Sequence, residues 1–273
     1  MIQSAVTISL VPEARGGPFV FWDDLAAGCA KAKSLGFDAV EVFARSADEL
    51  NAKTFRQILE THQLKLAAMG TGAGWIVHKL RLTDPDAIVR RRAQQFIGAI
   101  IDFAGSFGAP AIVGSMQGRA DGAVSRADAL GWLREALEQL GPRAHALGVP
   151  LIFEPLNRYE TNLIRTVDEA LELLRPLRTK NVKLLCDLFH MNIEESSIAD
   201  ALRRAGALVG HVHFADSNRL AIGFGHTAMP PVLQALADMG YTGYLSAEIL
   251  PLPDGDAAAA QTMASFRKLM MKG

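Results

Sequence analysis

The sequence predicts an α/β fold, a (β/α)₈ barrel formed by a single domain over residues 1–273. Short apolar runs alternate eight times with amphipathic stretches of helical spacing. The apolar runs show no internal alternation of polar residues, which is typical of strands in a parallel sheet covered on both faces. The length of 273 residues also matches the size expected for eight such units.

The apolar runs are short enough to be strands rather than buried helices. The expected strands, in chain order, are 6–10, 39–43, 64–69, 110–115, 149–154, 182–187, 209–214 and 243–249. The amphipathic stretches are expected to be helices over roughly 22–35, 46–62, 84–107, 125–147, 166–178, 196–205, 229–239 and 256–271.

Local punctuation supports several of these boundaries. Thr83 with Asp86, and Thr166 with Glu169, have the spacing of a capping box at a helix start. Glycine follows four of the expected helices, where a left-handed cap is needed, at Gly36, Gly108, Gly148 and Gly240. The alternative fold, a doubly wound open sheet, usually has fewer strands and often a glycine-rich first turn, which LVPEARGGPF lacks.

Composition limits the classes of partner. The formal net charge of -1 gives no support for a nucleic-acid or membrane-surface partner. No apolar run reaches the roughly 20 residues that span a bilayer, and the N-terminal segment lacks the features of a signal peptide. Cys29 and Cys186 form no CxxC pattern, so we expect buried, reduced thiols in a cytoplasmic protein.

The last four expected strands end in potential metal ligands. In a barrel, catalytic groups gather at the C-terminal ends of the strands. Each residue taken alone could instead cap a helix or pair with a lysine. Three ionised carboxylates together in a partly desolvated mouth need a compensating charge, and no Lys or Arg is placed there to neutralise all of them. We therefore expect one divalent cation, bound by Glu154, Asp187, His213 and Glu248.

The donor set bears on the metal and on a second histidine. Carboxylate oxygens with one histidine favour Mn²⁺, with Mg²⁺ or Co²⁺ as alternatives. His211 lies two residues before His213, so both side chains should point to the same face of their strand. His211 is expected to be a hydrogen-bonded residue of the barrel core, with a ligand role less favoured.

Two loops are expected near the barrel mouth. The glycine run GTGAGW (70–75) is not expected to open a helix directly, and it lacks the Lys-Ser/Thr of a phosphate-binding loop. We expect it to line the pocket, with Trp75 and His78 near the substrate. Phe19, Phe21 and Trp22 are expected either to cover the mouth, which we favour, or to form a subunit contact.

Four short motifs resemble one family. The runs EPLNRYE (154–160), C-D-x-x-H (186–190), H-V-H-F-x-x-x-N-R (211–219) and S-A-E (246–248) resemble the ketose 3-epimerases of the xylose isomerase-like barrel superfamily. The resemblance implies that the four strand-end residues hold the metal. It also implies that Glu160, His190 and Arg219 bind oxygens at the carbonyl end of a sugar.

The chemistry implied is metal-dependent inversion or movement of a centre next to a ketone, through an enediolate. Inversion needs acid/base groups on both faces of a planar intermediate, and Glu154 and Glu248 suit these roles. The substrate is expected to be a small sugar or keto-polyol, and the assembly a homodimer or homotetramer.

Other activities stay open at this point. The same barrel could serve an inosose or hydroxypyruvate isomerase, or a metal-dependent dehydratase acting on a cyclic keto-polyol. His213 favours an epimerase over a hydroxypyruvate isomerase. Few histidines in the first half and the near-neutral charge oppose an endonuclease IV-like nuclease, and the complete set of acids opposes a sugar-binding protein without catalysis.

Overall fold

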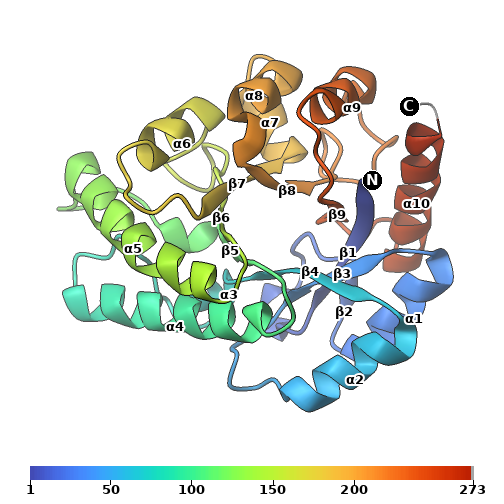
Figure 1. The fold of residues 1–273 in the computed structure, drawn as a ribbon, viewed down its shortest axis with the longest axis horizontal. Coiled ribbons are helices and arrows are strands. Elements are labelled where there is room, and N and C mark those ends of the chain that lie inside the picture. Colours follow the sequence, from blue (N-terminus) through green and yellow to red (C-terminus); the bar gives the residue numbers. More distant parts are fainter. Residues whose placement is uncertain (272–273) are drawn as a thin grey trace.

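The computed structural model describes residues 1–271, and residues 272 and 273, the last two of the expected domain, lie outside this range. Within it, parallel strands form one sheet that closes on itself, because β1 pairs with both β3 and β9. The prediction of a (β/α)₈ barrel is confirmed (Figure 1). The strands are β1 Gln3–Ser9, β2 Phe21–Trp22, β3 Ala39–Phe43, β4 Lys65–Gly70, β5 Ala111–Val113, β6 Leu151–Phe153, β7 Val182–Asp187, β8 Val209–His213 and β9 Tyr244–Ala247.

The short strand β2 was not expected. It pairs only with the end of β1, through Ile8 and Phe21, and stands outside the closed ring of eight strands. Helix α1 therefore begins at Leu25 rather than at 22, after Asp24 accepts a hydrogen bond from the backbone N–H of Ala27. The eight expected strands correspond to β1 and to β3 through β9.

Helices surround the barrel on its outer side (Figure 1). Two short helices were missed: α3 begins three residues after the end of β4, and α7 follows β7 directly. The expectation that the run 70–75 does not open a helix is wrong, since α3 begins at Ala73. The helices are α1 Leu25–Leu35, α2 Ala52–His62, α3 Ala73–Ile76, α4 Ala87–Gly105, α5 Arg126–Ala146, α6 Val167–Leu174, α7 Leu188–Glu194, α8 Ile198–Ala205, α9 Met229–Asp238 and α10 Gly255–Met270.

Only one of the two expected capping boxes forms. At the start of α6, Thr166 accepts from the backbone of Glu169, and the Glu169 carboxylate accepts from the backbone of Thr166. At α4 the N-cap is Asp86, while the Thr83 hydroxyl donates instead to the backbone carbonyl of Gln117. Thr83 thus connects the segment before α4 to the segment after β5. The four expected cap glycines all adopt positive φ.

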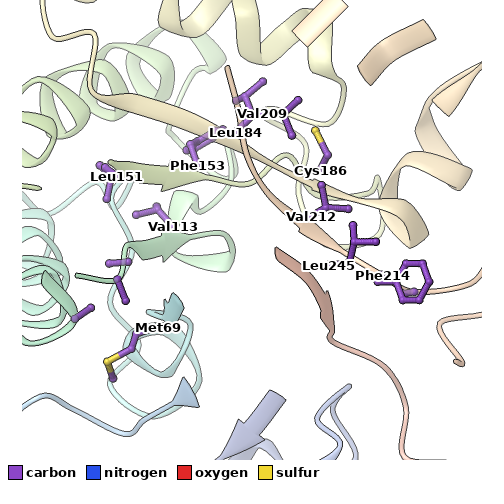
Figure 2. Close-up of a cluster of buried hydrophobic side chains, with 14 of the residues drawn as sticks. Met69, Val113, Leu151, Phe153, Leu184, Cys186, Val209, Val212, Phe214 and Leu245 are labelled. Atoms are coloured by element: carbon purple, nitrogen blue, oxygen red, sulfur yellow. The ribbon is translucent and has the colours of Figure 1, made fainter. Parts of the chain in front are cut away.

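Strand residues alternate between two apolar layers. Leu151 and Phe153 of β6 point outward into the layer under the helices, while Ile152 between them packs inside the barrel. Figure 2 shows the outward layer continuing from strand to strand through Val113, Leu184, Val212 and Leu245. This alternation sets the register of the site, because every second residue of a strand is directed into the barrel.

Two further expectations concern the cysteines and membrane-spanning helices. Cys29 and Cys186 are buried free thiols, as expected, and burial raises the pKa of each to about 12. No helix within residues 1–271 combines the length and the apolar character that crossing a bilayer requires.

Candidate metal and sugar site

Four of the expected residues meet at the C-terminal end of the barrel. Asp187 and His213 are the last residues of β7 and β8, Glu154 follows β6 directly, and Glu248 follows β9 directly. The alternation places them in the barrel interior, since Asp187 has the parity of inward-facing Leu185. One ligand atom from each of the four residues lies within 4.8 Å of all the others.

His213 lies at the centre of this group. Its Nδ1 is 3.3 Å from Asp187 Oδ2, 3.4 Å from Glu248 Oε2 and 3.7 Å from Glu154 Oε1. The side chains of His213 and Asp187 are almost fully buried, and those of Glu154 and Glu248 retain only small exposed fractions. The arrangement therefore directs one imidazole nitrogen and three carboxylates at a common point.

The electrostatics of this group show a shortage of positive charge. Burial raises the pKa of Glu154, and the neighbouring Glu248 and Asp187 raise it further, to well above the ordinary value. Burial lowers the pKa of His213, but Glu248 and Glu41 outweigh burial and hold that pKa well above its usual range. Protons on these two residues thus balance carboxylate charge that a bound cation would balance instead.

The residues present fit a divalent cation. Three carboxylates and one histidine form a hard, mostly oxygen donor set. Among the described residues, Glu154 Oε1 is buried without a hydrogen-bond partner, which is unfavourable unless something else binds it. The four ligand atoms are close enough together to share one ion.

A buried glutamate that was not predicted from the sequence contacts His213 on the side of the ring opposite the three carboxylates. Glu41, in the middle of β3, has its Oε1 3.2 Å from His213 Nε2 and its Oε2 2.8 Å from His211 Nε2. Burial raises the pKa of Glu41, but the two imidazoles outweigh burial and bring that pKa below its usual range. His211 is a hydrogen-bonded core residue, as expected, although Glu41, His211 and His213 also lie close enough to form a second candidate ligand group.

The three expected sugar-binding residues surround the same site. Arg219 donates from Nη2 to Glu248 Oε2 at 2.8 Å and from Nη1 to Glu160 Oε1 at 3.3 Å. Its guanidinium also lies over the ring of Phe189. His190, in α7, places Nε2 3.8 Å from Glu154 Oε1. Burial lowers the pKa of His190 below the ordinary histidine value.

The loop after β8 holds Arg219 in an uncommon conformation. Arg219 has φ 61°, in the left-handed region of backbone conformation that residues other than glycine and asparagine seldom adopt. The loop is fixed by the buried Asp216 carboxylate, which accepts from the backbone N–H groups of Ser217, Gly223, Gly225 and Thr227. These hydrogen bonds lower the pKa of Asp216 to about 2, against the effect of burial.

A cavity of about 180 Å³ opens onto the cluster. Its lining includes Glu154, Glu248, His190, His213 and Arg219, together with the apolar side chains of Phe19, Phe43 and Ile76. The rings of Phe19 and Phe43 stack with centroids 4.6 Å apart. Phe19 thus lines the pocket, as expected, and so do Gly70, Thr71 and Gly72 of the glycine run. The other expected side chains are absent from its described lining, namely Phe21, Trp22, Trp75 and His78.

Comparison with known proteins places this barrel in a family. The model of the family described as "Xylose isomerase-like TIM barrel" matches residues 29–269. A D-psicose 3-epimerase from Ruminiclostridium cellulolyticum is 32% identical over 222 residues, which cover 78% of this chain and 74% of that protein. The chain belongs to the xylose isomerase-like TIM barrel family.

Two further relatives of this xylose isomerase-like barrel agree. A D-psicose 3-epimerase from Agrobacterium fabrum is 31% identical over 78% of this chain and 75% of its own length. The crystal structure of D-psicose 3-epimerase with D-tagatose from Clostridium cellulolyticum H10 matches with a TM-score of 0.80 and 22% identity, over 99% of both chains, which supports the fold alone. The names of the sequence relatives support an enzyme of the isomerase class, a carbohydrate epimerase.

Proposed function

We propose that the protein is a metal-dependent ketose 3-epimerase. The observation that carries this proposal is that Glu154 and Glu248, from the ends of β6 and β9, line one small cavity with His213. The same three residues form one ligand group with Asp187. Relatives named D-psicose 3-epimerase support the same reaction class. The proposed substrate is a small ketose, and the proposed metal is Mn²⁺, with Mg²⁺ or Co²⁺ as alternatives.

The proposed metal ligands are Glu154, Asp187, His213 and Glu248. A divalent ion held by them would act as a Lewis acid and supply positive charge next to the ketone of the substrate. This contribution is needed because a positioned base alone accelerates such reactions by about 10²–10⁴-fold, below the roughly 10⁶-fold or more that enzymes reach.

The two glutamates act as the acid/base pair. One carboxylate takes the proton from carbon 3, which is acidified by the neighbouring ketone, and the other returns a proton to the opposite face of the planar enediolate. Arg219 already bonds Glu248 and Glu160, so it links the two sides of the cavity and presents guanidinium N–H groups to sugar oxygens. Glu160 and His190 complete the proposed contacts at the carbonyl end.

The cavity walls favour a neutral substrate end away from the carboxylates. Phe19, Phe43 and Ile76 supply apolar surface to the cavity wall. Within the described lining, Arg219 is the one Lys or Arg side chain, and it is already paired with two glutamates.

Solvent-exchange NMR tests the proposed function. The protein, loaded with Mg²⁺ in D₂O, is offered ketohexoses, ketopentoses, inososes and 3-dehydroshikimate in turn. We expect a ketose to give its carbon-3 epimer with deuterium at carbon 3. Movement of the carbonyl would indicate an isomerase instead, and loss of water would indicate a dehydratase.

Matched variants assign the two bases. Glu154→Gln and Glu248→Gln should each lower turnover by about 10²-fold or more, while Glu60→Gln, on the exposed side of α2, should leave it unchanged. Undiminished exchange and turnover in both site variants would exclude the two-base mechanism.

A further inference from the structure

The buried residue Asn157 has a place in the site that the motifs do not explain. It follows β6 in the same loop as Glu160, and its side chain is almost fully buried. Its backbone carbonyl accepts from the N–H groups of Glu160 and Thr161, forming the turn that carries Glu160. Its amide group contacts three different partners, and these contacts determine which way the amide faces.

The orientation of the amide is set by a backbone donor. Asn157 Oδ1 accepts a hydrogen bond of 2.9 Å from the backbone N–H of Tyr159. The amide nitrogen must therefore occupy the opposite position, where it lies 2.8 Å from His190 Nδ1 and 3.2 Å from Glu160 Oε1. An amide NH₂ group has two hydrogens, so it can donate one to each of these neighbours.

This orientation fixes the proton on His190. An amide NH₂ has no lone pair to offer as an acceptor, so His190 Nδ1 must be the acceptor and cannot carry a hydrogen. In a neutral imidazole the single ring hydrogen then resides on Nε2.

The Nε2–H group lies beside the carboxylates of the site without a protein acceptor. His190 lines the cavity, and among residues 1–271 its Nε2 has no hydrogen-bond partner although it is buried. The nearest carboxylate oxygens, Asp187 Oδ2 and Glu154 Oε1, lie 3.7 and 3.8 Å away, beyond hydrogen-bond reach. A buried donor without an acceptor is unfavourable, so a ligand oxygen that accepts its hydrogen would be bound more tightly.

We propose that Asn157 is a positioning residue that holds His190 in the Nε2–H tautomer, so that His190 donates a hydrogen bond to an oxygen of the bound substrate. The tautomer follows from contacts within the protein, and its use toward a sugar rests on the proposed 3-epimerase function. The substrate atom at this position is therefore an acceptor, a carbonyl or hydroxyl oxygen offering a lone pair.

A change from amide to carboxylate tests this proposal with little change of shape. Asn157→Asp keeps one oxygen for the N–H of Tyr159 but replaces the donor facing His190 by an acceptor. The protein is labelled with ¹⁵N-histidine and loaded with Mg²⁺, and long-range ¹H–¹⁵N spectra are recorded near neutral pH. The signals of His190 among the seven histidines are assigned by their absence in His190→Gln.

In the unchanged protein we expect a proton-bearing shift at Nε2 and a pyridine-type shift at Nδ1. In Asn157→Asp we expect a proton on Nδ1, and kcat/KM for the ketose that turns over should fall about tenfold or more, the effect of one misdirected hydrogen bond. Arg158→Ala is the control, because Arg158 is the next residue but pairs with Glu194 rather than with His190. It should alter neither the tautomer nor kcat/KM.

Two results would overturn the proposal. One is a protonated Nδ1 on His190 in the unchanged protein, which needs no variant to fold. The other is an unchanged tautomer in a folded Asn157→Asp variant, which would leave Asn157 as a turn-forming residue only. The spectra involve no sugar, so failure of the 3-epimerase assignment would appear separately, as absent turnover by a protein whose His190 carries the expected tautomer.

Discussion

His213 Nε2 donates to Glu41 Oε1 at 3.2 Å, while Nδ1 of the same ring faces the three carboxylates at the barrel rim. A carboxylate behind a metal-binding histidine fixes the orientation of the ring and strengthens it as a ligand. Glu41 also accepts from His211, so one buried carboxylate on β3 holds both histidines of β8.

The first prediction concerns this carboxylate. Glu41→Gln keeps the shape of the side chain but removes its charge, and we expect metal affinity to fall about 10–100-fold. Isothermal titration calorimetry with Mn²⁺ measures the change in metal affinity. Glu60→Gln, an exposed glutamate on α2, is the matched control. Equal affinity of Glu41→Gln and the unchanged protein would mean that His213 needs no support from β3.

The sequence predicted the barrel and brought its four strand-end residues together, but Glu41 was missed for a physical reason. Strand ends are informative because parallel strands share one catalytic edge, whereas Glu41 lies in the middle of AVEVF. Its signal was an acid inside an otherwise apolar strand, which must have a partner when buried. That partner, His213, is 172 residues away in the sequence, so only the closed barrel reveals the pair.

Loop features were predicted less well than strands. Trp75 was expected in the pocket, but α3 forms over Ala73–Ile76 and leaves Trp75 partly exposed outside the described lining. Strand residues follow a period of two that fixes their direction. In a loop, one extra helical turn changes the direction of every side chain. No periodic pattern in GTGAGW indicates that such a turn forms.

The second prediction concerns the pH dependence of the metal-free protein. The pKa of Glu154 in the folded protein lies above its ordinary value of 4.5. Between these values the folded state holds a proton that the unfolded chain has lost, so stability falls as pH rises. In EDTA, Glu154→Gln should therefore melt above the unchanged protein at pH 8, and the difference should shrink toward pH 5.

Thermal melting across this pH range measures the effect, and each kcal/mol corresponds to about 2–4 °C in Tm. The pKa of His213 is also raised, so its contribution to the stability of the fold likewise decreases as pH rises. This decrease occurs in both proteins. With saturating metal the order should reverse, because Glu154→Gln lacks a charged ligand. A constant difference in Tm from pH 5 to pH 8 would contradict a raised pKa for Glu154.

The third prediction concerns the anchor of the Arg219 loop. Asp216→Asn leaves one oxygen to accept N–H groups and turns an NH₂ toward the others, so we expect a loss of about 1–3 kcal/mol in the free energy of unfolding. Arg219 lies in this loop, so KM for the ketose should also rise. Urea unfolding and steady-state kinetics measure the two effects, with exposed Asp48→Asn as the control.

Because the pKa of Asp216 is lowered to about 2, the effect of Asp216→Asn on stability should depend on pH. The stabilisation is fully present above the ordinary aspartate pKa and is lost as pH falls toward 2. The stability difference between the unchanged protein and Asp216→Asn should therefore narrow in acid. A difference that stays constant down to pH 3 would show that the carboxylate charge is not what holds the loop.

The fourth prediction concerns the space beside Glu154. A Cβ built on Gly114, just after β5, would lie 2.2 Å from Glu154 Oε2, so Gly114→Ala must displace this carboxylate. Because misplacement of a catalytic group by about 1 Å can cost about 10²-fold in rate, we expect a loss of that order in turnover, together with weaker metal binding.

Gly131→Ala is the matched control for this substitution. Gly131 lies inside α5, and a Cβ there meets nothing within 4 Å, so alanine should raise the free energy of unfolding by about 0.5–1 kcal/mol and leave turnover unchanged. Kinetics and metal titration of both variants separate a general effect of alanine from a local one. Full turnover in Gly114→Ala would mean that Glu154 tolerates displacement, which a proton-transferring carboxylate at this position does not.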